Sequence, residues 1–267
     1  KLLMMQGGGV MTQRRLGLAL GAGGLRGLAH VGVLQVLEEE GIAVDCIAGC
    51  SIGALVGAMY CAGHKPQDIL KLACHLPKAH WLDMNMSKLG MFSGRRIWGT
   101  MDVLLQKKTF AQLNIPLRIV AADLKSGKEV VFAEGPVAAA VRASVSVPGV
   151  FLPFEWEDML LVDGAVLNPV PSDLAREMGV DVVVAVDLTS KEEAPEVKSF
   201  VDVMLRSIDI MERELLRHKH RDWDVLLQPN VGYVSPSSFN HLKECVALGR
   251  VAAQAALPAI QELLSGT

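Results

Sequence analysis

The first sixty residues alternate short apolar runs with stretches of helical periodicity. Residues 15–21 (RLGLALG) form an apolar run that ends in glycine, and residues 27–40 place apolar side chains three and four positions apart. A second apolar run at 44–49 leads into residues 51–62, which are small, apolar and of helix length. This succession of strand, helix, strand and helix predicts the start of a parallel sheet.

The rest of the chain continues in the same way. Apolar and β-branched runs between turn residues predict strands at 117–122, 129–132, around 159–162 and at 182–186. Helical spacing and capping residues predict helices at 136–145, 172–178, 201–215 and 241–264. Pro258 is expected to kink or break the last helix. The fold class that follows is α/β with a mostly parallel central sheet.

One uncharged stretch, residues 46–63, is long enough to be weighed as a membrane span. Four glycines interrupt it, and Val44-Asp45 before it is typical of the entrance to a strand. A strand, a tight turn and a buried helix therefore explain the stretch better than a transmembrane helix does.

Composition narrows the class of protein. The chain has 267 residues, 51% of them hydrophobic, which is ample for the core of one large domain. We expect residues 11–267 to form that domain and residues 1–10 to be a loose leader or a tag remnant. A formal charge of −3 gives no basic field that would attract nucleic acid. Five cysteines without paired spacing argue against disulfides and a zinc site, and they favour a reducing cytoplasm.

The segment Gly49-Cys50-Ser51-Ile52-Gly53 lies between a predicted strand and a predicted helix, which is the context of a nucleophile elbow. A serine on so sharp a turn adopts strained backbone angles, and glycine on both sides removes side chains that would collide. The helix that follows directs its amides and the positive end of its dipole toward Ser51. The same pattern also arises by chance in helices rich in glycine and alanine, so the motif alone does not establish catalysis.

A second glycine-rich segment, residues 21–27 (GAGGLRG), follows the first predicted strand. At the carboxyl end of that strand it is expected to lie beside Ser51, where its N–H groups can turn toward an anion. In acyl transfer that anion is the tetrahedral oxyanion. The competing interpretation is a dinucleotide-binding loop, but that motif requires a third glycine where this chain has Arg26.

A serine nucleophile needs a base. Histidine is the usual partner, but none of the seven histidines stands in a strand-end motif. Asp163 follows an apolar strand at the edge where α/β sites assemble, although an Asp-Gly pair is also a common turn. Asp123 and Asp187 follow strands in the same way. We interpret Asp123 as a turn brace, keep Asp187 as an alternative base, and interpret Cys50 as a packing residue because it precedes the apex of the elbow.

Five ordered motifs resemble those of the bacterial patatin-like phospholipases, a group that includes plant patatins, cytosolic phospholipase A2 and neuropathy target esterase. The resemblance covers about residues 16–188. The motifs are the glycine-rich loop with Arg26, the Gly-x-Ser-x-Gly elbow, residues 122–127 (ADLKSG), residues 143–153 (ASVSVPGVFLP) and Asp163-Gly164-Ala165. The resemblance implies a three-layer α/β/α patatin-like fold.

The same resemblance implies a Ser51–Asp163 dyad in place of a serine–histidine–acid triad, so that Asp163 takes the Ser51 proton directly. It also implies that N–H groups around Gly23, Gly24 and Leu25 hold the oxyanion, with Arg26 adding positive charge or bracing the loop. The remaining motif glycines are Gly21, Gly27, Gly49, Gly53 and Gly164. Ala22 stands where the family often has glycine, which a negative φ accommodates. No metal and no cofactor are expected.

Three further segments are given an interpretation. Residues 81–98 hold methionines and aromatic residues among few charges, and we hypothesise that they form part of an acyl-chain entrance or a lid, although core filling explains them equally well. The basic run at 213–221 is partly cancelled by Glu212, Glu214 and Asp222, which favours a solvated helix face over a headgroup site. Residues 190–195 (SKEEAP) are expected to be a surface loop.

The expected activity is hydrolysis of a fatty acyl ester of a phospholipid, lysophospholipid or related lipid through an acyl-Ser51 intermediate. The expected partners are the acyl lipid and, transiently, a membrane surface reached from the cytoplasm, with no nucleic acid. Two other classes stay open. One is an acyl transferase to carrier protein or coenzyme A, which uses a similar elbow with a histidine base, and the other is a lipid-binding regulator without turnover.

Overall fold

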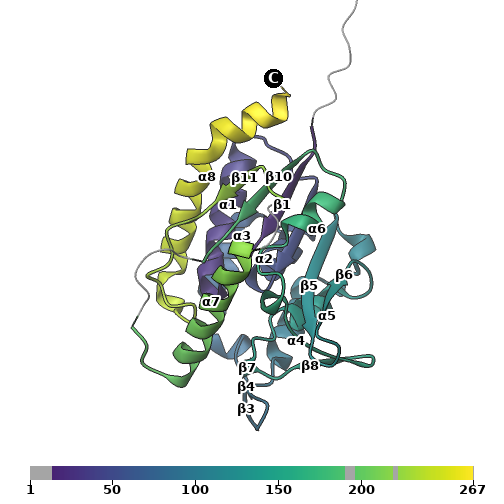
Figure 1. Ribbon diagram of the computed structural model, residues 1–267, viewed down its shortest axis with the longest axis vertical. Coiled ribbons are helices and arrows are strands. Elements are labelled where there is room, and N and C mark those ends of the chain that lie inside the picture. The colour runs from purple at the N-terminus through teal and green to yellow at the C-terminus, as the bar shows by residue number, and fades with distance from the viewer. Residues whose placement is uncertain (1–13, 190–195, 219–221, 267) are drawn as a thin grey trace, which may run out of the picture.

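The computed structural model describes residues 14–189, 196–218 and 222–266 (Figure 1). The expected leader at 1–10 and the expected surface loop at 190–195 lie outside the described residues.

A mixed sheet forms the centre of the molecule. Its strands are β1 (Leu16–Leu20), β2 (Cys46–Cys50), β5 (Leu117–Asp123), β6 (Lys128–Phe132), β8 (Phe154–Trp156), β9 (Met159–Asp163), β10 (Val182–Val186) and β11 (Val225–Leu227). Within the described residues their order is β11-β10-β1-β2-β5-β9-β8, and β6 pairs with β5. Pairing is parallel from β11 to β5 and antiparallel among β5, β6, β9 and β8. The antiparallel strands are therefore confined to one end of the sheet.

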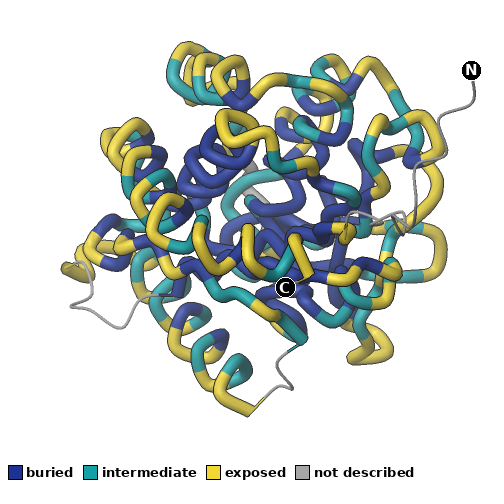
Figure 2. The backbone as a smooth tube through the Cα atoms, turned by 90° about the horizontal axis from the view of Figure 1, so that it is seen from above, coloured by how far each residue is buried: buried dark blue, intermediate teal, exposed yellow. Residues whose placement is uncertain are grey.

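Helices cover both faces of this sheet, and the side chains on the two faces differ in size. The leucines of β1 face the larger core, which is covered by α1 (Leu28–Glu39), α2 (Ile52–Cys61), α5 (Val137–Ser144) and α8 (Leu242–Ser265). Ala19 points the other way, into a smaller core covered by α6 (Ser172–Glu177). Figure 2 shows the buried segments gathered in the middle of the molecule. The three-layer α/β fold expected from the sequence is confirmed.

The remaining elements lie around the carboxyl ends of the parallel strands and beside the sheet. They are the helices α3 (Pro66–His75), α4 (Arg95–Leu104) and α7 (Phe200–His218), and a small sheet of β3 (Met84–Ser87), β4 (Gly90–Phe92) and β7 (Gly149–Phe151). Short 3₁₀ helices occur at Gly24–Gly27, Lys78–His80, Phe110–Gln112, Gly164–Val166 and Phe239–His241.

The strands and helices predicted from the pattern are present, with ends that differ by up to three residues. A break at Pro258 was one of the two outcomes predicted for the last helix. It does not occur, because α8 continues through this exposed residue. Residues 46–63 form β2, a tight turn and the ten-residue α2, which contradicts the membrane-span alternative. In the part of the chain that the structure describes, no helix is both long enough and apolar enough to cross a bilayer.

Candidate active site

Ser51 occupies a sharp turn between β2 and α2. Its backbone angles, φ 54° and ψ −122°, are rarely adopted by a residue with a side chain, and its N–H donates to the Ser144 hydroxyl at 2.8 Å. Close packing requires the flanking glycines. A Cβ on Gly53 would lie 2.1 Å from the carbonyl oxygen of Leu20, and a Cβ on Gly49 would lie 2.7 Å from the next helix. The turn therefore has the geometry of a nucleophile elbow.

The pairing of β5 explains why Asp163 meets Ser51. One edge of β5 carries β6, and the opposite edge is shared by β2 and β9. Cys50, the last residue of β2, lies opposite Val120, and Asp163, the last residue of β9, lies opposite Ala121. The two strands thus meet end to end on consecutive residues of β5. The residue that follows Cys50 is brought against Asp163.

Ser51 and Asp163 are joined by a short hydrogen bond in a buried setting. The Ser51 hydroxyl donates to Oδ2 of Asp163 at 2.5 Å. The other carboxylate oxygen accepts from the Ala165 N–H at 2.9 Å and from the Cys50 thiol at 3.8 Å. Burial raises the pKa of Asp163 to about 6, against the opposing effect of these three hydrogen bonds. At pH 7 the group is therefore mostly ionised, with a higher proton affinity than an ordinary aspartate, which suits a general base.

The glycine-rich loop packs against the start of α2, where a Cβ on Gly27 would lie 2.2 Å from Ile52. Gly23 and Gly24 have φ of 151° and 59°, values that favour glycine. The N–H of Leu25 donates to the carbonyl oxygen of Pro236 at 2.7 Å. Within the described residues the N–H groups of Gly23 and Gly24 make no hydrogen bond, so these two are the ones available to an oxyanion.

Two buried side chains fix this loop from behind. Arg26 donates through Nε to the carbonyl oxygen of Gly23 at 3.1 Å and through Nη2 to Asp209 of α7 at 2.7 Å. Of the two roles considered for Arg26, these hydrogen bonds fit bracing of the loop. His30 on α1 lies with Nε2 2.8 Å from the carbonyl oxygen of Gly21. Burial lowers the pKa of His30 to about 4, although that backbone hydrogen bond opposes the shift. His30 is therefore neutral and donates through Nε2.

Gly21 and Gly164 are also places of close backbone approach. A Cβ on Gly21 would lie 2.7 Å from the carbonyl oxygen of Val186, and a Cβ on Gly164 would lie 2.5 Å from that of Val120. Both glycines therefore let neighbouring strands come together at the carboxyl edge of the sheet, on either side of Ser51.

The other candidates from the sequence have structural roles. Asp123 accepts hydrogen bonds from the hydroxyl and N–H of Ser126 and from two further N–H groups, which lower its pKa to about 2, so the turn-brace interpretation is confirmed. Asp187 accepts from Thr189 and Gln228 and not from Ser51. Burial, and after it the charge of Asp163, raises the pKa of the Cys50 thiol well above its usual value, in keeping with packing. No histidine that the structure describes hydrogen-bonds to Ser51 or Asp163.

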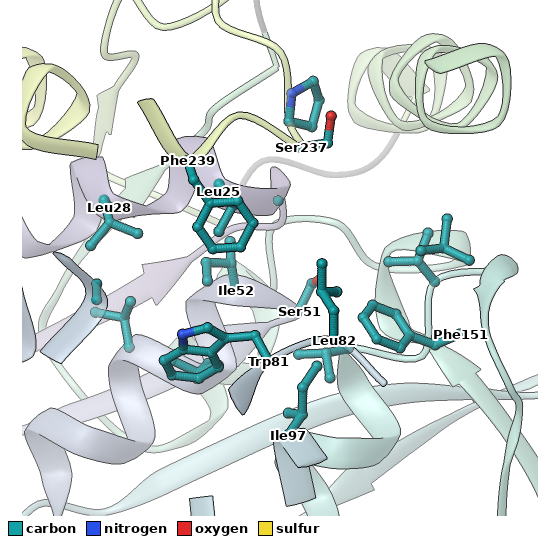
Figure 3. A pocket seen from close by; sticks show the side chains of 18 of the residues that line it. Leu25, Leu28, Ser51, Ile52, Trp81, Leu82, Ile97, Phe151, Ser237 and Phe239 are labelled. Carbon is teal, nitrogen blue, oxygen red and sulfur yellow. The ribbon is translucent and has the colours of Figure 1, made fainter. Parts of the chain in front are cut away.

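A large apolar cavity of about 420 Å³ has Ser51 in its lining. Figure 3 shows apolar side chains around it, from α1 and α2 and from the segments that follow. The predicted entrance segment 81–98 contributes Trp81, Leu82, Phe92 and Ile97, whereas its Met84 is 80% exposed. The volume lies in the range of ligand-binding cavities.

A smaller cavity of about 40 Å³ also has Ser51 in its lining. Its polar lining includes Asp163, Arg26 and two acidic residues of α7, Asp209 and Glu212. Sequence reasoning missed Asp209, and it counted Glu212 among the charges of a solvated helix face, which is wrong because Glu212 is only 5% exposed. The available signal was their spacing, because Leu205, Ile208, Asp209 and Glu212 follow the i, i+3, i+4, i+7 pattern of one helix face.

Comparison with known proteins shows which proteins this chain resembles. The family model described as patatin-like phospholipase matches residues 18–176. An uncharacterized NTE family protein of Mycobacterium tuberculosis is 37% identical over 193 residues, which cover 68% of this chain and 51% of that protein. Human patatin-like phospholipase domain-containing protein 6 is 33% identical over 192 residues, which cover 69% of this chain and 14% of that protein. The chain thus matches about half the length of the mycobacterial relative and a much smaller part of the human one.

Among solved structures, VipD from Legionella pneumophila superposes with a TM-score of 0.69 at 15% identity, covering 92% of this chain and 67% of VipD. ExoU from Pseudomonas aeruginosa, in its complex with SpcU, gives a TM-score of 0.51 at 14% identity and covers 94% of this chain and 53% of ExoU. At such identities the likeness concerns the fold alone.

Proposed function

Because this chain belongs to the patatin-like phospholipase family, a family of lipid ester hydrolases, we propose that it cleaves a fatty acyl ester through an acyl-Ser51 intermediate. The observation that carries the proposal is the 2.5 Å hydrogen bond from Ser51 to Asp163 at the wall of a 420 Å³ apolar cavity. A nucleophile held by its base beside an apolar cavity is the arrangement that hydrolysis of a fatty acyl ester requires.

The two steps of the reaction use the same residues. Asp163 accepts the Ser51 proton as the hydroxyl oxygen attacks the acyl carbon, and the N–H groups of Gly23 and Gly24 stabilise the oxyanion. The positive end of the α2 dipole favours the same negative charge. The departing alcohol takes the proton from Asp163. Water then attacks the acyl-Ser51 ester in the reverse sense, with Asp163 again as the base.

The apolar cavity is proposed to receive the fatty acyl chain. Its lining residues Trp81, Leu82 and Ile97 leave few polar partners for a headgroup, so the acyl chain is expected to enter there and the alcohol portion to lie in the smaller cavity that Ser51 also lines. This supports the hypothesis that part of segment 81–98 forms the acyl-chain entrance.

A peripheral contact with a lipid surface is proposed next to this cavity. We define the apolar rim as Met84, Leu89, Val197, Phe200 and Val203, whose side chains are all at least half exposed. Figure 1 shows the β3–β4 hairpin and the start of α7 at the same lower end of the molecule. Val201 and Leu205, on the same turns of α7, line the apolar cavity. A lipid surface against the rim would therefore meet the cavity that takes its acyl chain.

The test uses a fluorophosphonate probe and p-nitrophenyl acyl esters on the wild type, Ser51→Ala and Asp163→Asn. Each variant is expected to lose at least about a thousandfold in kcat/KM, and Ser51→Ala is expected to lose labelling. Asp187→Asn is the matched control, because Asp187 also ends a strand but bonds Thr189 and Gln228, and it is expected to retain activity. Wild-type turnover by Ser51→Ala contradicts the mechanism, and turnover that requires an acceptor thiol indicates an acyl transferase.

A further inference from the structure

The small cavity beside Ser51 has the size and lining of a site for a hydroxyl group. At about 40 Å³ it has room for a few water-sized groups. Its lining includes Asp163, residues of the glycine-rich loop and residues of α7. A bound water needs two to four polar partners, and this cavity offers them, whereas the apolar cavity does not.

Glu212 is the unexplained residue of this cavity. It is only 5% exposed and lines the cavity, yet within the described part of the chain its carboxyl group makes no hydrogen bond. Its neighbour Asp209 differs in this respect, because one carboxylate oxygen accepts from Arg26 and the other from Arg206, each at 2.7 Å. A buried carboxyl without a protein partner indicates a ligand that supplies one.

The surroundings of Glu212 set its protonation. Burial raises the pKa of Glu212 well above its ordinary value, and the charges of Asp163, Asp209 and Asp187 raise it further, while Arg26 opposes them. The protonated form of this carboxyl is therefore favoured more than in an ordinary glutamate. In that form it offers one O–H donor and one carbonyl acceptor, which is the complement of a hydroxyl group.

We propose that Glu212 and Asp163 form a hydroxyl-binding subsite, which holds the oxygen of the departing alcohol during acylation and the hydrolytic water during deacylation. The inference rests on the proposed function. The alcohol oxygen and the water oxygen are assigned to the same place because deacylation is the reverse of acylation, with water in place of the alcohol.

The proton balance of the two steps leaves Glu212 unchanged. In acylation the Ser51 proton passes to Asp163, the bond from the Ser51 oxygen to the acyl carbon forms, the ester C–O bond breaks, and the departing oxygen takes the proton from Asp163. In deacylation a water proton passes to Asp163, the bond from the water oxygen to the acyl carbon forms, the bond to Ser51 breaks, and Ser51 regains a proton. Glu212 orients the oxygen by hydrogen bonds and keeps its own proton, so it is a positioning residue.

The same cavity limits the chemical class of the group beside the ester. Arg26 is already paired with Asp209, and Asp163 carries negative charge when it acts as the base. An anionic group would therefore meet carboxylates, and the described residues that line the cavity include no free cation to pair with it. The group next to the scissile ester is expected to be an uncharged alcohol, with any phosphate further along the molecule.

The test compares Glu212→Gln, which keeps a donor and an acceptor, with Glu212→Leu, which removes both. Glu212→Met is made in parallel because its flexible side chain is more readily accommodated if leucine prevents folding. Glu214→Gln, on the exposed side of the same helix, is the control. The burst and the steady-state release of p-nitrophenol are measured per fluorophosphonate-titrated site, and acyl-Ser51 is quantified by intact mass.

We expect Glu212→Leu and Glu212→Met to keep the burst, because p-nitrophenol leaves without help, while steady-state turnover falls about tenfold and acyl-enzyme accumulates. Glu212→Gln is expected to stay within about threefold of the wild type, because it preserves the hydrogen bonds. Wild-type turnover by the leucine and methionine variants overturns the inference, and so does a glutamine variant as slow as the leucine one. A wild type with neither burst nor labelling contradicts the proposed function itself.

Discussion

Asp163 owes its proposed role to its surroundings more than to its sequence neighbours. An aspartate before a glycine is usually a turn residue, and Asp163 does accept the Ala165 N–H as such a residue would. Burial at the end of β9 raises the pKa of Asp163. The pairing of β9 with β5 brings Asp163 into contact with Ser51. The folded site thus keeps a base of intermediate strength next to its nucleophile.

The pH dependence of the rate follows from this pKa. Only ionised Asp163 can accept the Ser51 proton, so kcat/KM is expected to rise through a midpoint near pH 6 and to level off above about pH 7. The measurement is kcat/KM for an uncharged short-chain ester from pH 4.5 to pH 8. A rate that falls over this interval, or a midpoint at the ordinary value for aspartate, contradicts the role of Asp163.

The pH dependence of the free energy of unfolding provides a control for the assignment of this pKa to Asp163. The pKa of Asp163 is higher in the folded chain than the ordinary aspartate value of 3.8, so its contribution to stability is full below about pH 4 and is lost as the pH rises through 6. The difference corresponds to about 3 kcal/mol in the free energy of unfolding, as an upper estimate. Relative to the wild type, Asp163→Asn should therefore gain stability between pH 4 and pH 7 in urea unfolding.

Sequence reasoning reached Ser51, Asp163 and Arg26 because each sits in a backbone motif whose shape requires particular residues. It did not reach Glu212, Asp209 or His30. These side chains lie on helices. The sequence alone does not distinguish a polar residue on the buried face of a helix from one on the exposed face until its neighbour in the fold is known. Asp209 and Arg26 are 183 residues apart, and no local pattern joins them. The Leu25 N–H was expected to be available, but its partner Pro236 comes from a distant loop.

At the scale of elements, the elbow depends on the contact between α2 and β1. The start of α2 passes so close to the end of β1 that position 53 has no room for a side chain. Position 53 lies two residues after Ser51, so we expect the geometry of Ser51 to depend on this contact.

Gly53→Ala tests this dependence. Its methyl group would lie 2.1 Å from the Leu20 carbonyl oxygen, and the backbone has to shift to accept it. The expected loss is about 1–3 kcal/mol or more in the free energy of unfolding, together with loss of fluorophosphonate labelling. Gly99→Ala in α4 is the control, because a Cβ there meets nothing within 4 Å, and it should be neutral or stabilising. If Gly53→Ala labels like the wild type, the packing argument is wrong.

The regular elements were more predictable than the irregular ones for a physical reason. Strands of five or more residues with a buried apolar pattern, such as β1 and β10, carry enough periodicity to be recognised. The strands β4, β7 and β11 have three residues each and gain their order from pairing partners that lie far along the chain. The shared edge of β5, where β2 and β9 meet, depends on the same long-range pairing.

At the scale of the whole molecule, the residues of the proposed chemistry gather at the carboxyl ends of the parallel strands. The small sheet and α7 contribute part of the lining of the apolar cavity. The apolar rim extends this arrangement to the surface. Its exposed side chains lie beside residues that line the cavity, so one end of the molecule combines an apolar surface with access to Ser51.

The double variant Phe200→Ser/Val203→Ser tests whether this end meets lipid. Both side chains are exposed and neither lines the cavity, so hydrolysis of a dispersed short-chain ester should be unchanged. Loss of their apolar area should weaken binding to phosphatidylcholine vesicles by about tenfold, measured by co-sedimentation. Ile210→Ser/Met211→Ser is the matched control, because these residues are similarly exposed on the same helix but lie two or more turns from the rim. Equal vesicle binding by the two double variants would show that the surface contact, if the chain makes one, lies elsewhere.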